Sequence, residues 1–167
     1  VARGSTSGGA VSVATGAAWA ALGSDTGGPI RIPAALQGLV GFKATARWVP
    51  TSACVPLSTS LDTAAAITRS VRDAVLLHEI LAARSVPIDR RPLSAWRLAV
   101  PRTVMLDALE PAVATTFECA LDGLRAAGAR LEEIDLSALA GAAALQRGGG
   151  LAAAESWAWH RRRLAER

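Results

Sequence analysis

The sequence predicts an α/β fold in which helices cover both faces of a mixed, mainly parallel sheet. Three patterns support this prediction: strand–helix–strand over residues 97–134, a capped helix from Ser70, and loop–helix–strand–loop over residues 3–28. A helix that connects two strands of one sheet usually makes those strands parallel and packs against them. With 167 residues, 51% hydrophobic content and a mean hydropathy of +0.29, the chain is long and apolar enough to bury a core.

Glycine-rich loops flank the first two predicted elements. Residues 3–9 read as a hydroxyl-rich loop, in which glycine permits positive φ. A helix of small residues is expected at 10–16, a buried strand at about 17–22, and a second glycine-rich turn at 23–28. Residues 38–60 alternate short apolar pieces with Gly, Pro and Ser, which predicts short strands and turns.

A capping-box pattern begins the next helix. Ser70 precedes Asp73 by three residues, so a helix is expected from there to about Arg84. The apolar residues expected on its inner face are Val71, Val75, Ile80 and Leu81.

The strand–helix–strand pattern of the second half is the clearest in the chain. A strand is expected at 97–101, a helix beginning at Pro111 and ending before Gly128, and a strand at 130–134. The expected inner face of the helix carries Val113, Phe117, Leu121 and Leu124. The Ala/Gly tract 138–150 is expected to be mainly loop, with weak helix at its flanks, and a last helix runs from about residue 151 to 167.

Composition argues against several partners and cofactors. The net charge is +4, but the only tight basic cluster is residues 160–163, so a nucleic-acid partner is not expected. No apolar run reaches the roughly 18 residues of a membrane span. Cys54 and Cys119 do not suggest a disulfide framework, and His78 has no partner at metal-ligand spacing, so we expect no metal and a reducing, cytoplasmic location. The loop at 4–9 lacks the lysine of a phosphate loop, and no cofactor is expected.

Two glycine- and serine-rich loops carry a family resemblance. Residues 3–10 (Arg-Gly-Ser-Thr-Ser-Gly-Gly-Ala) resemble the Gly-Gly-Ser-Ser-(Ser/Gly)-Gly-Ser-Ala segment of the amidase signature family. Residues 23–34 (Gly-Ser-Asp-Thr-Gly-Gly-Pro-Ile-Arg-Ile-Pro-Ala) resemble its second half, which normally reads Gly-Gly-Ser-Ile-Arg. The similarity continues through residues 38–45 and 60–73. The resemblance implies the α/β amidase-signature fold and amide hydrolysis by a Ser–Ser–Lys arrangement.

The resemblance also assigns roles to individual positions. Ser5 matches the bridging serine, which the family holds after a cis peptide bond, and the nucleophilic serine falls at position 29, where this chain has Pro29. The oxyanion and substrate-binding positions are Thr26, Gly27, Gly28 and Arg31. Because proline has neither a hydroxyl nor an N–H, nucleophile and one oxyanion donor are absent together.

The family's catalytic lysine lies upstream of the first loop, whereas Lys43 matches a different lysine of the family. Residues 1–167 therefore read as a partial amidase-signature domain, without the lysine-bearing N-terminal segment and the C-terminal part. One hypothesis is an amide hydrolase by family that is inactive as this chain. The alternatives are a non-catalytic remnant, a module that binds a small amide or carboxylate, and a subunit completed by a separate N-terminal chain.

Overall fold

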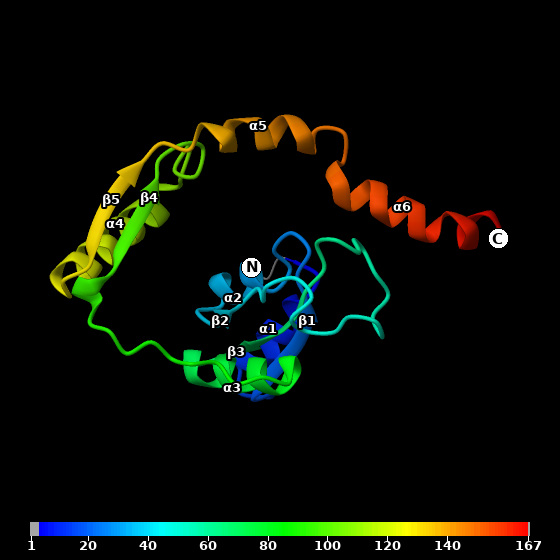
Figure 1. The fold of residues 1–167 in the computed structure, drawn as a ribbon, viewed down its shortest axis with the longest axis horizontal. Coiled ribbons are helices and arrows are strands. Elements are labelled where there is room, and N and C mark those ends of the chain that lie inside the picture. The colour runs from blue at the N-terminus through cyan, green and yellow to red at the C-terminus, as the bar shows by residue number, and fades with distance from the viewer. Residues whose placement is uncertain (1–3, 167) are drawn as a thin grey trace. The chain divides into compact units, whose positions relative to one another are not determined.

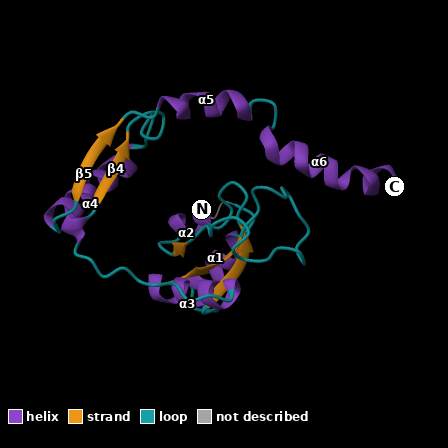
Figure 2. Cartoon of the chain, in the orientation of Figure 1, coloured by secondary structure: helices purple, strands orange, loops and turns teal. Residues whose placement is uncertain are grey.

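The chain forms two compact units, each built from helices and strands (Figure 1; Figure 2). The computed structural model describes residues 4–166, apart from the side chain of Ala143. Unit 1 comprises residues 1–87 and 149–167, and unit 2 comprises residues 88–148. Both units mix helices with strands, so the predicted α/β class is confirmed.

A three-stranded antiparallel sheet in the order β1-β3-β2 forms the centre of unit 1. Its strands are β1 (Ala20–Ser24), β2 (Val40–Gly41) and β3 (Ala64–Thr68). The central strand β3 reads Ala-Ala-Ala-Ile-Thr and is buried at its last four residues. Such a continuous run of buried residues is typical of a strand that is covered on both faces.

Helices cover both faces of this sheet, as predicted. On one face, α1 (Ser7–Ala14) and α2 (Arg31–Leu36) contribute to a core with the strand residues Ala65 and Ile67. Ala66 and Thr68 point to the opposite face and are equally buried. The helix α3 (Val71–Ala82) packs against β3, and we assign it to that second face.

The amino terminus of α3 is capped as predicted. The Ser70 hydroxyl oxygen accepts a hydrogen bond from the backbone N–H of Asp73 at 3.1 Å, and its O–H donates to the Asp73 carboxylate at 2.7 Å. The predicted inner face is wrong at Val71 and Ile80, which are about two-thirds exposed, whereas Val75 and Leu81 are half-buried. Ala74 and His78 are the buried residues instead, because the small alanine lets the helix approach the sheet closely.

His78 occupies an aromatic setting in unit 1. The Phe42 ring meets it edge-on at 5.1 Å between centroids, and Trp48 stacks on it at 6.2 Å. Both ring nitrogens are buried, and neither has a hydrogen-bond partner among the described residues. The structure therefore places His78 inside the unit, with an unmet hydrogen-bonding requirement.

Unit 2 is the predicted strand–helix–strand element. The strands β4 (Arg97–Pro101) and β5 (Arg130–Ile134) pair in parallel, and α4 (Pro111–Ala126) connects them. A short 3₁₀ turn, Leu93–Ala95, precedes β4. Gly128 follows α4 with φ +95°, as expected of a helix-terminating glycine.

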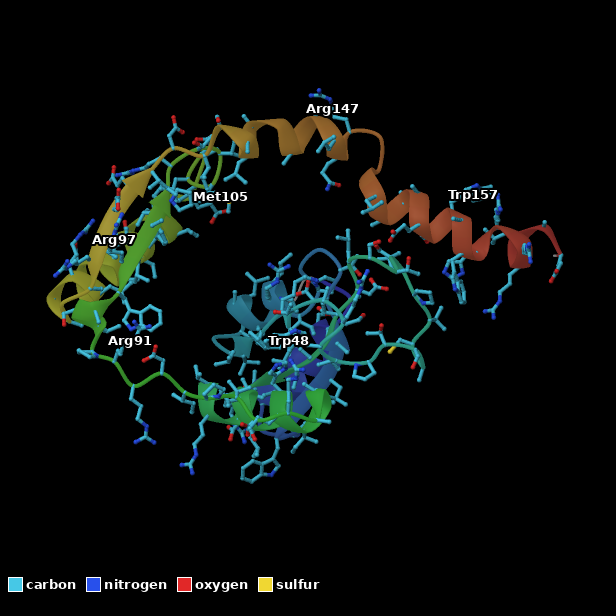
Figure 3. All side chains as sticks on the ribbon, in the orientation of Figure 1. Trp48, Arg91, Arg97, Met105, Arg147 and Trp157 are labelled. Carbon is cyan, nitrogen blue, oxygen red and sulfur yellow. The ribbon has the colours of Figure 1, made fainter. Side chains whose placement is uncertain are left out.

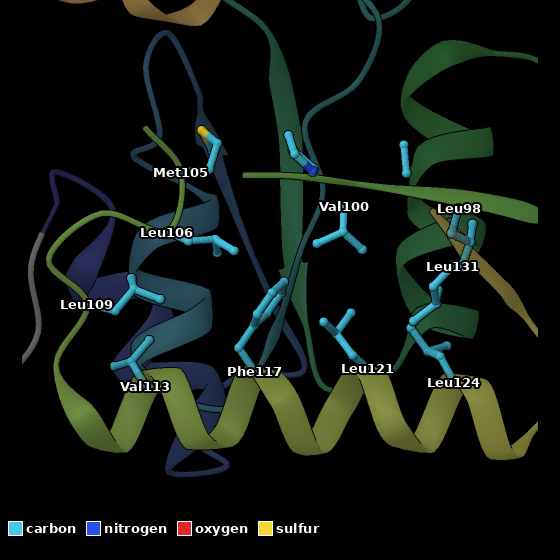
Figure 4. A pocket seen from close by; sticks show the side chains of 12 residues that line it. Leu98, Val100, Met105, Leu106, Leu109, Val113, Phe117, Leu121, Leu124 and Leu131 are labelled. Atoms are coloured by element: carbon cyan, nitrogen blue, oxygen red, sulfur yellow. The ribbon is translucent and has the colours of Figure 1, made fainter. Parts of the chain in front are cut away.

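The predicted apolar face of α4 points toward the strands of unit 2 (Figure 4). Between helix and strands lies a cavity of about 480 Å³ with almost wholly apolar walls. Its walls include Leu98, Val100, Phe117, Leu121, Leu124 and Leu131.

Several predicted boundaries are corrected by the structure. The Ala/Gly tract is not mainly loop: α5 (Ser137–Gln146) is a helix, because alanine is the strongest helix former. The last helix, α6 (Gly150–Ala165), is confirmed to within two residues and belongs to unit 1. Helix α1 starts three residues earlier than expected, and β2 is the only strand within 38–60 in the described chain.

Helix α2 was not predicted, and neither was β3. In the described part of the chain, no helix is both long and apolar enough to cross a membrane.

Candidate functional site

The loop that carries the second resemblance motif lies between β1 and α2. Gly28 has φ +127°, a backbone conformation that residues with a Cβ atom rarely adopt, so this turn favours glycine. Pro29 follows, half-buried, in a turn that the Ile32 N–H closes onto the Gly28 carbonyl at 2.8 Å. The missing N–H of proline costs little in such a first helical turn, so Pro29 is compatible with the local fold.

Asp25 holds this loop from inside. Its fully buried carboxylate accepts hydrogen bonds from the Gly28 N–H at 2.7 Å and from the Arg31 side chain, through Nε and one terminal nitrogen, each at 3.0 Å. Burial alone would raise the pKa of the Asp25 carboxyl, but the bonds from Arg31 and Gly28 outweigh it and lower the pKa to about 2. Asp25 is therefore ionised and pins the loop at both ends.

Lys43, the single lysine of the chain, anchors the same loop from the other side. Its ammonium group donates to the Asp25 backbone carbonyl, to the Leu61 carbonyl at 2.9 Å and to the Thr63 hydroxyl at 3.3 Å. It also lies 3.7 Å from the Asp25 carboxylate. The Lys43 ammonium group is thus hydrogen-bonded to acceptors that hold the loop in place.

Asp62 is the third anchor of the loop. One of its carboxylate oxygens accepts a hydrogen bond from the Thr26 hydroxyl, and the other accepts from the backbone N–H groups of Leu57 and Ser58 at 2.8 and 3.0 Å. A hollow of about 280 Å³ adjoins Asp62 and has Ser24 and Trp159 among its walls.

The structure brings the two resemblance loops together. A Cβ atom on Gly4 would lie 3.6 Å from the Pro29 carbonyl oxygen and 3.2 Å from Pro33 Cδ, so the first loop lies against position 29. Ser5 follows Gly4 as an exposed residue in the turn before α1. No peptide bond among the described residues is cis, which departs from the family geometry at Ser5.

The structure leaves fewer backbone N–H groups free to act as oxyanion donors than the sequence predicts. The Gly28 N–H is already bonded to Asp25, and position 29 has no N–H. The N–H groups of Thr26 and Gly27 have no hydrogen-bond partner within residues 4–166. The Arg31 guanidinium is paired with Asp25 and remains about half exposed, so it stabilises the loop, and its expected contact with a ligand stays a prediction.

Sequence reasoning missed Asp25, Lys43 and Asp62 as site residues. All three lie within the stretches that carry the resemblance. Asp25 contacts Gly28 and Arg31 only three and six residues away, whereas Lys43 and Asp62 reach the loop through contacts 17 to 36 positions apart. Such contacts have no local sequence signature. Within the described residues, no cluster of three His, Cys, Asp or Glu side chains could hold a metal ion.

A model of the family described as Amidase matches residues 1–159 of this chain. The chain belongs to the amidase family. A crystal structure of an amidase superposes with a TM-score of 0.88 at 39% identity, covering 98% of this chain and 36% of that one. The crystal structure of a glutamyl-tRNA(Gln) amidotransferase subunit from Thermotoga maritima gives a TM-score of 0.81 at 32% identity, covering 98% and 40%.

Curated relatives match over a similar stretch. The indoleacetamide hydrolase of Allorhizobium ampelinum is 45% identical over 121 residues, which cover 72% of this chain and 26% of the relative. The 2-amino-5-chloromuconic acid deaminase of Comamonas testosteroni is 40% identical over 157 residues, covering 91% and 34%. The chain thus spans about a quarter to a third of the length of these relatives.

Proposed function

We propose that this amidase-family chain retains a carbonyl-binding loop but does not hydrolyse amides by serine attack. The observation that carries the proposal is Pro29, which occupies the position that the resemblance gives to the nucleophilic serine. Proline has no hydroxyl to attack a carbonyl carbon. It also lacks an N–H, and loss of one oxyanion donor costs about 10²–10³ in rate in serine hydrolases.

Neighbouring hydroxyls are poor substitutes for the missing serine. A serine or threonine becomes a nucleophile when a base removes its proton. The Thr26 hydroxyl donates its hydrogen to Asp62, and the Lys43 ammonium is held by the Asp25 and Leu61 carbonyl oxygens. Asp62 is thus within hydrogen-bond reach of a hydroxyl, but a carboxylate is a far weaker base than the lysine amine of the Ser–Ser–Lys arrangement, and it also holds the Leu57 and Ser58 N–H groups.

The loop instead favours binding of an uncharged carbonyl group. The Thr26 and Gly27 N–H groups are the donors left without partners in the described chain. The Arg31 charge is already balanced by Asp25, which removes the main attraction for a carboxylate. A small amide is therefore a better ligand than a carboxylate, and the name of the indoleacetamide hydrolase relative suggests aryl acetamides as first probes.

A turnover experiment tests the proposal. The 167-residue chain is expected to hydrolyse none of a panel of aryl and alkyl acetamides. Hydrolysis is expected only when Pro29→Ser is combined with fusion to the lysine-bearing N-terminal segment of a homologous amidase. Turnover by the unmodified chain, or by the fusion that keeps Pro29, would show that the assignment of position 29 is wrong.

A second candidate function is a subunit completed by another chain. Strand β1 is an edge strand of the described sheet, and two apolar side chains are exposed there: Leu22 within the strand (67%) and Trp19 just before it (84%). An exposed apolar edge is able to pair with a further strand. Co-expression with the N-terminal segment of an amidase should then yield a stable complex and slow amide exchange in β1, whereas no complex argues for the first candidate alone.

A further inference from the structure

Helix α6 is fastened to a loop of unit 1 through one carboxylate. Glu155 accepts hydrogen bonds from the hydroxyls of Ser58 and Ser60, each at 2.5 Å, and from the Ser60 N–H at 3.0 Å. These residues are 95 or 97 positions from Glu155 in the sequence. Ser58 is fully buried, so its hydroxyl relies on Glu155 for an acceptor.

A second contact supports the same docking. The Nε2 atom of His160, about one and a half helical turns beyond Glu155, lies 3.1 Å from the Pro56 carbonyl oxygen. Both contacts fall on the loop that precedes Asp62. The hydrogen bonds from the two hydroxyls and from the Ser60 backbone lower the pKa of Glu155, so its charged form is the one that holds the loop.

The docked loop leads directly to Thr26. The N–H of Ser58 donates to one oxygen of Asp62, whose other oxygen accepts from the Thr26 hydroxyl. A continuous set of hydrogen bonds thus joins Glu155, Ser58, Asp62 and Thr26. Trp159 on the same helix also walls the hollow beside Asp62, so undocking α6 would open that hollow.

We propose that Glu155 is a positioning residue, which fixes the Thr26–Gly27 backbone through Ser58 and Asp62. The inference rests on the proposed function in one respect: the proposed function supplies the ligand that those backbone donors would bind. The positioning itself is a property of the protein without ligand. Charge-assisted hydrogen bonds are about twice as strong as neutral ones, so their loss is expected to loosen the segment that they hold.

Hydrogen exchange followed by mass spectrometry tests the positioning in the full 167-residue chain. Glu155→Ala is expected to speed exchange about tenfold in peptides that cover Leu57–Asp62 and, in those that cover Thr26–Gly28, at the Gly28 amide, which is the one bonded to Asp25. Glu155→Gln keeps one acceptor oxygen and should give an intermediate rate. Ser156→Ala changes the next residue of α6 without touching the carboxylate, and its rates should equal those of the wild type.

The exchange rate of Thr26–Gly28 distinguishes a role of Glu155 in positioning that loop from a role only in docking α6. Faster exchange confined to α6 and Leu57–Asp62, with Thr26–Gly28 unchanged, overturns the proposal. If Glu155→Ala unfolds the unit, Ser58→Ala removes the hydroxyl that links Glu155 to this set of hydrogen bonds, and unchanged Thr26–Gly28 exchange in that variant also overturns it.

A ligand-binding measurement separates this inference from the proposed function. Titration with indole-3-acetamide should perturb the Thr26 and Gly27 amides in NMR spectra of the wild type, with several-fold weaker binding in Glu155→Ala. Absence of binding in the wild type counts against the proposed function and leaves the exchange result as the test of Glu155. Equal binding in wild type and Glu155→Ala counts against the positioning role.

Discussion

The two units are stabilised by different kinds of contact. In unit 1, buried polar groups are prominent, and Asp25, Ser58 and Thr68 are each fully buried. In unit 2, the interior consists of aliphatic and aromatic side chains between α4 and its strands, and the ion pairs lie on the surface. Figure 3 shows Arg97 on unit 2, where it pairs with Glu132 and is three-quarters exposed.

This difference explains what each unit can do. Hydrogen bonds that connect residues far apart in the sequence fix a loop in one conformation, which a ligand-binding site requires. An apolar helix-on-sheet interface stabilises a unit without placing any reactive group. Asp25 and Leu121 are the residues on which this contrast depends most.

The largest expected effect is that of Asp25→Ala. Removal of the carboxylate leaves the Gly28 N–H and the half-exposed Arg31 guanidinium without their partner, and each hydrogen bond to a charged group contributes about 1.5–3 kcal/mol. Hydrogen exchange should therefore accelerate throughout unit 1 and remain unchanged in unit 2. Asp122→Ala is the matched control, since its exposed pair with Arg125 should contribute less than about 1 kcal/mol.

The converse change is Leu121→Ala in unit 2. Leu121 is 93% buried, and truncation of a buried leucine costs about 2–5 kcal/mol. Because the adjoining cavity already leaves part of its surface uncovered, we expect the lower end of that range. Exchange should accelerate in β4, α4 and β5 only; acceleration in β1 or β3 would contradict the division into two units.

Acid should weaken unit 1 through Asp25. The pKa of its carboxyl is lowered in the folded state to about 2, from an ordinary 3.8, so the stabilisation is present above pH 3.8 and is lost as the pH falls toward 2. The shift corresponds to about 2 kcal/mol. Urea unfolding at pH 6 and pH 2.5 should show a loss in the wild type that is smaller in Asp25→Asn, because the Asp25 share is absent while carboxyls such as Glu155 still titrate.

The smallest expected effect is a gain from His78→Leu. Its two buried ring nitrogens have no partner in the described chain, and an unmet buried polar group costs about 1–3 kcal/mol. Leucine fills a similar volume, so the melting temperature should rise by a few degrees. His160→Leu is the control and should bring no gain, because it removes the contact to Pro56.

The sequence predicted unit 2 better than unit 1 for a physical reason. Pro111, Gly128 and the apolar stripe of α4 act locally, so the bounds of β4 and β5 could be predicted from the sequence alone. In unit 1, α2 is six residues long and has no periodic stripe, and its position depends on Asp25 and Arg31.

The candidate site was predictable in part. The motifs gave the positions of Ser5 and Pro29, and the structure places their loops in contact. The assignment of Gly28 and Arg31 to a ligand stays a prediction, and their contacts with the buried Asp25 were not part of it. Asp62 and Glu155 could not be found, since their partners are distant in sequence.

The central claim is that no hydroxyl of this chain acts as an activated nucleophile. Intact-mass spectrometry after incubation with a serine-directed fluorophosphonate tests it most directly. The account predicts an unchanged mass for the 167-residue chain, since position 29 is proline and Lys43 is occupied by carbonyl oxygens. Stoichiometric labelling, mapped to Ser5, Ser24 or any other hydroxyl, would contradict it.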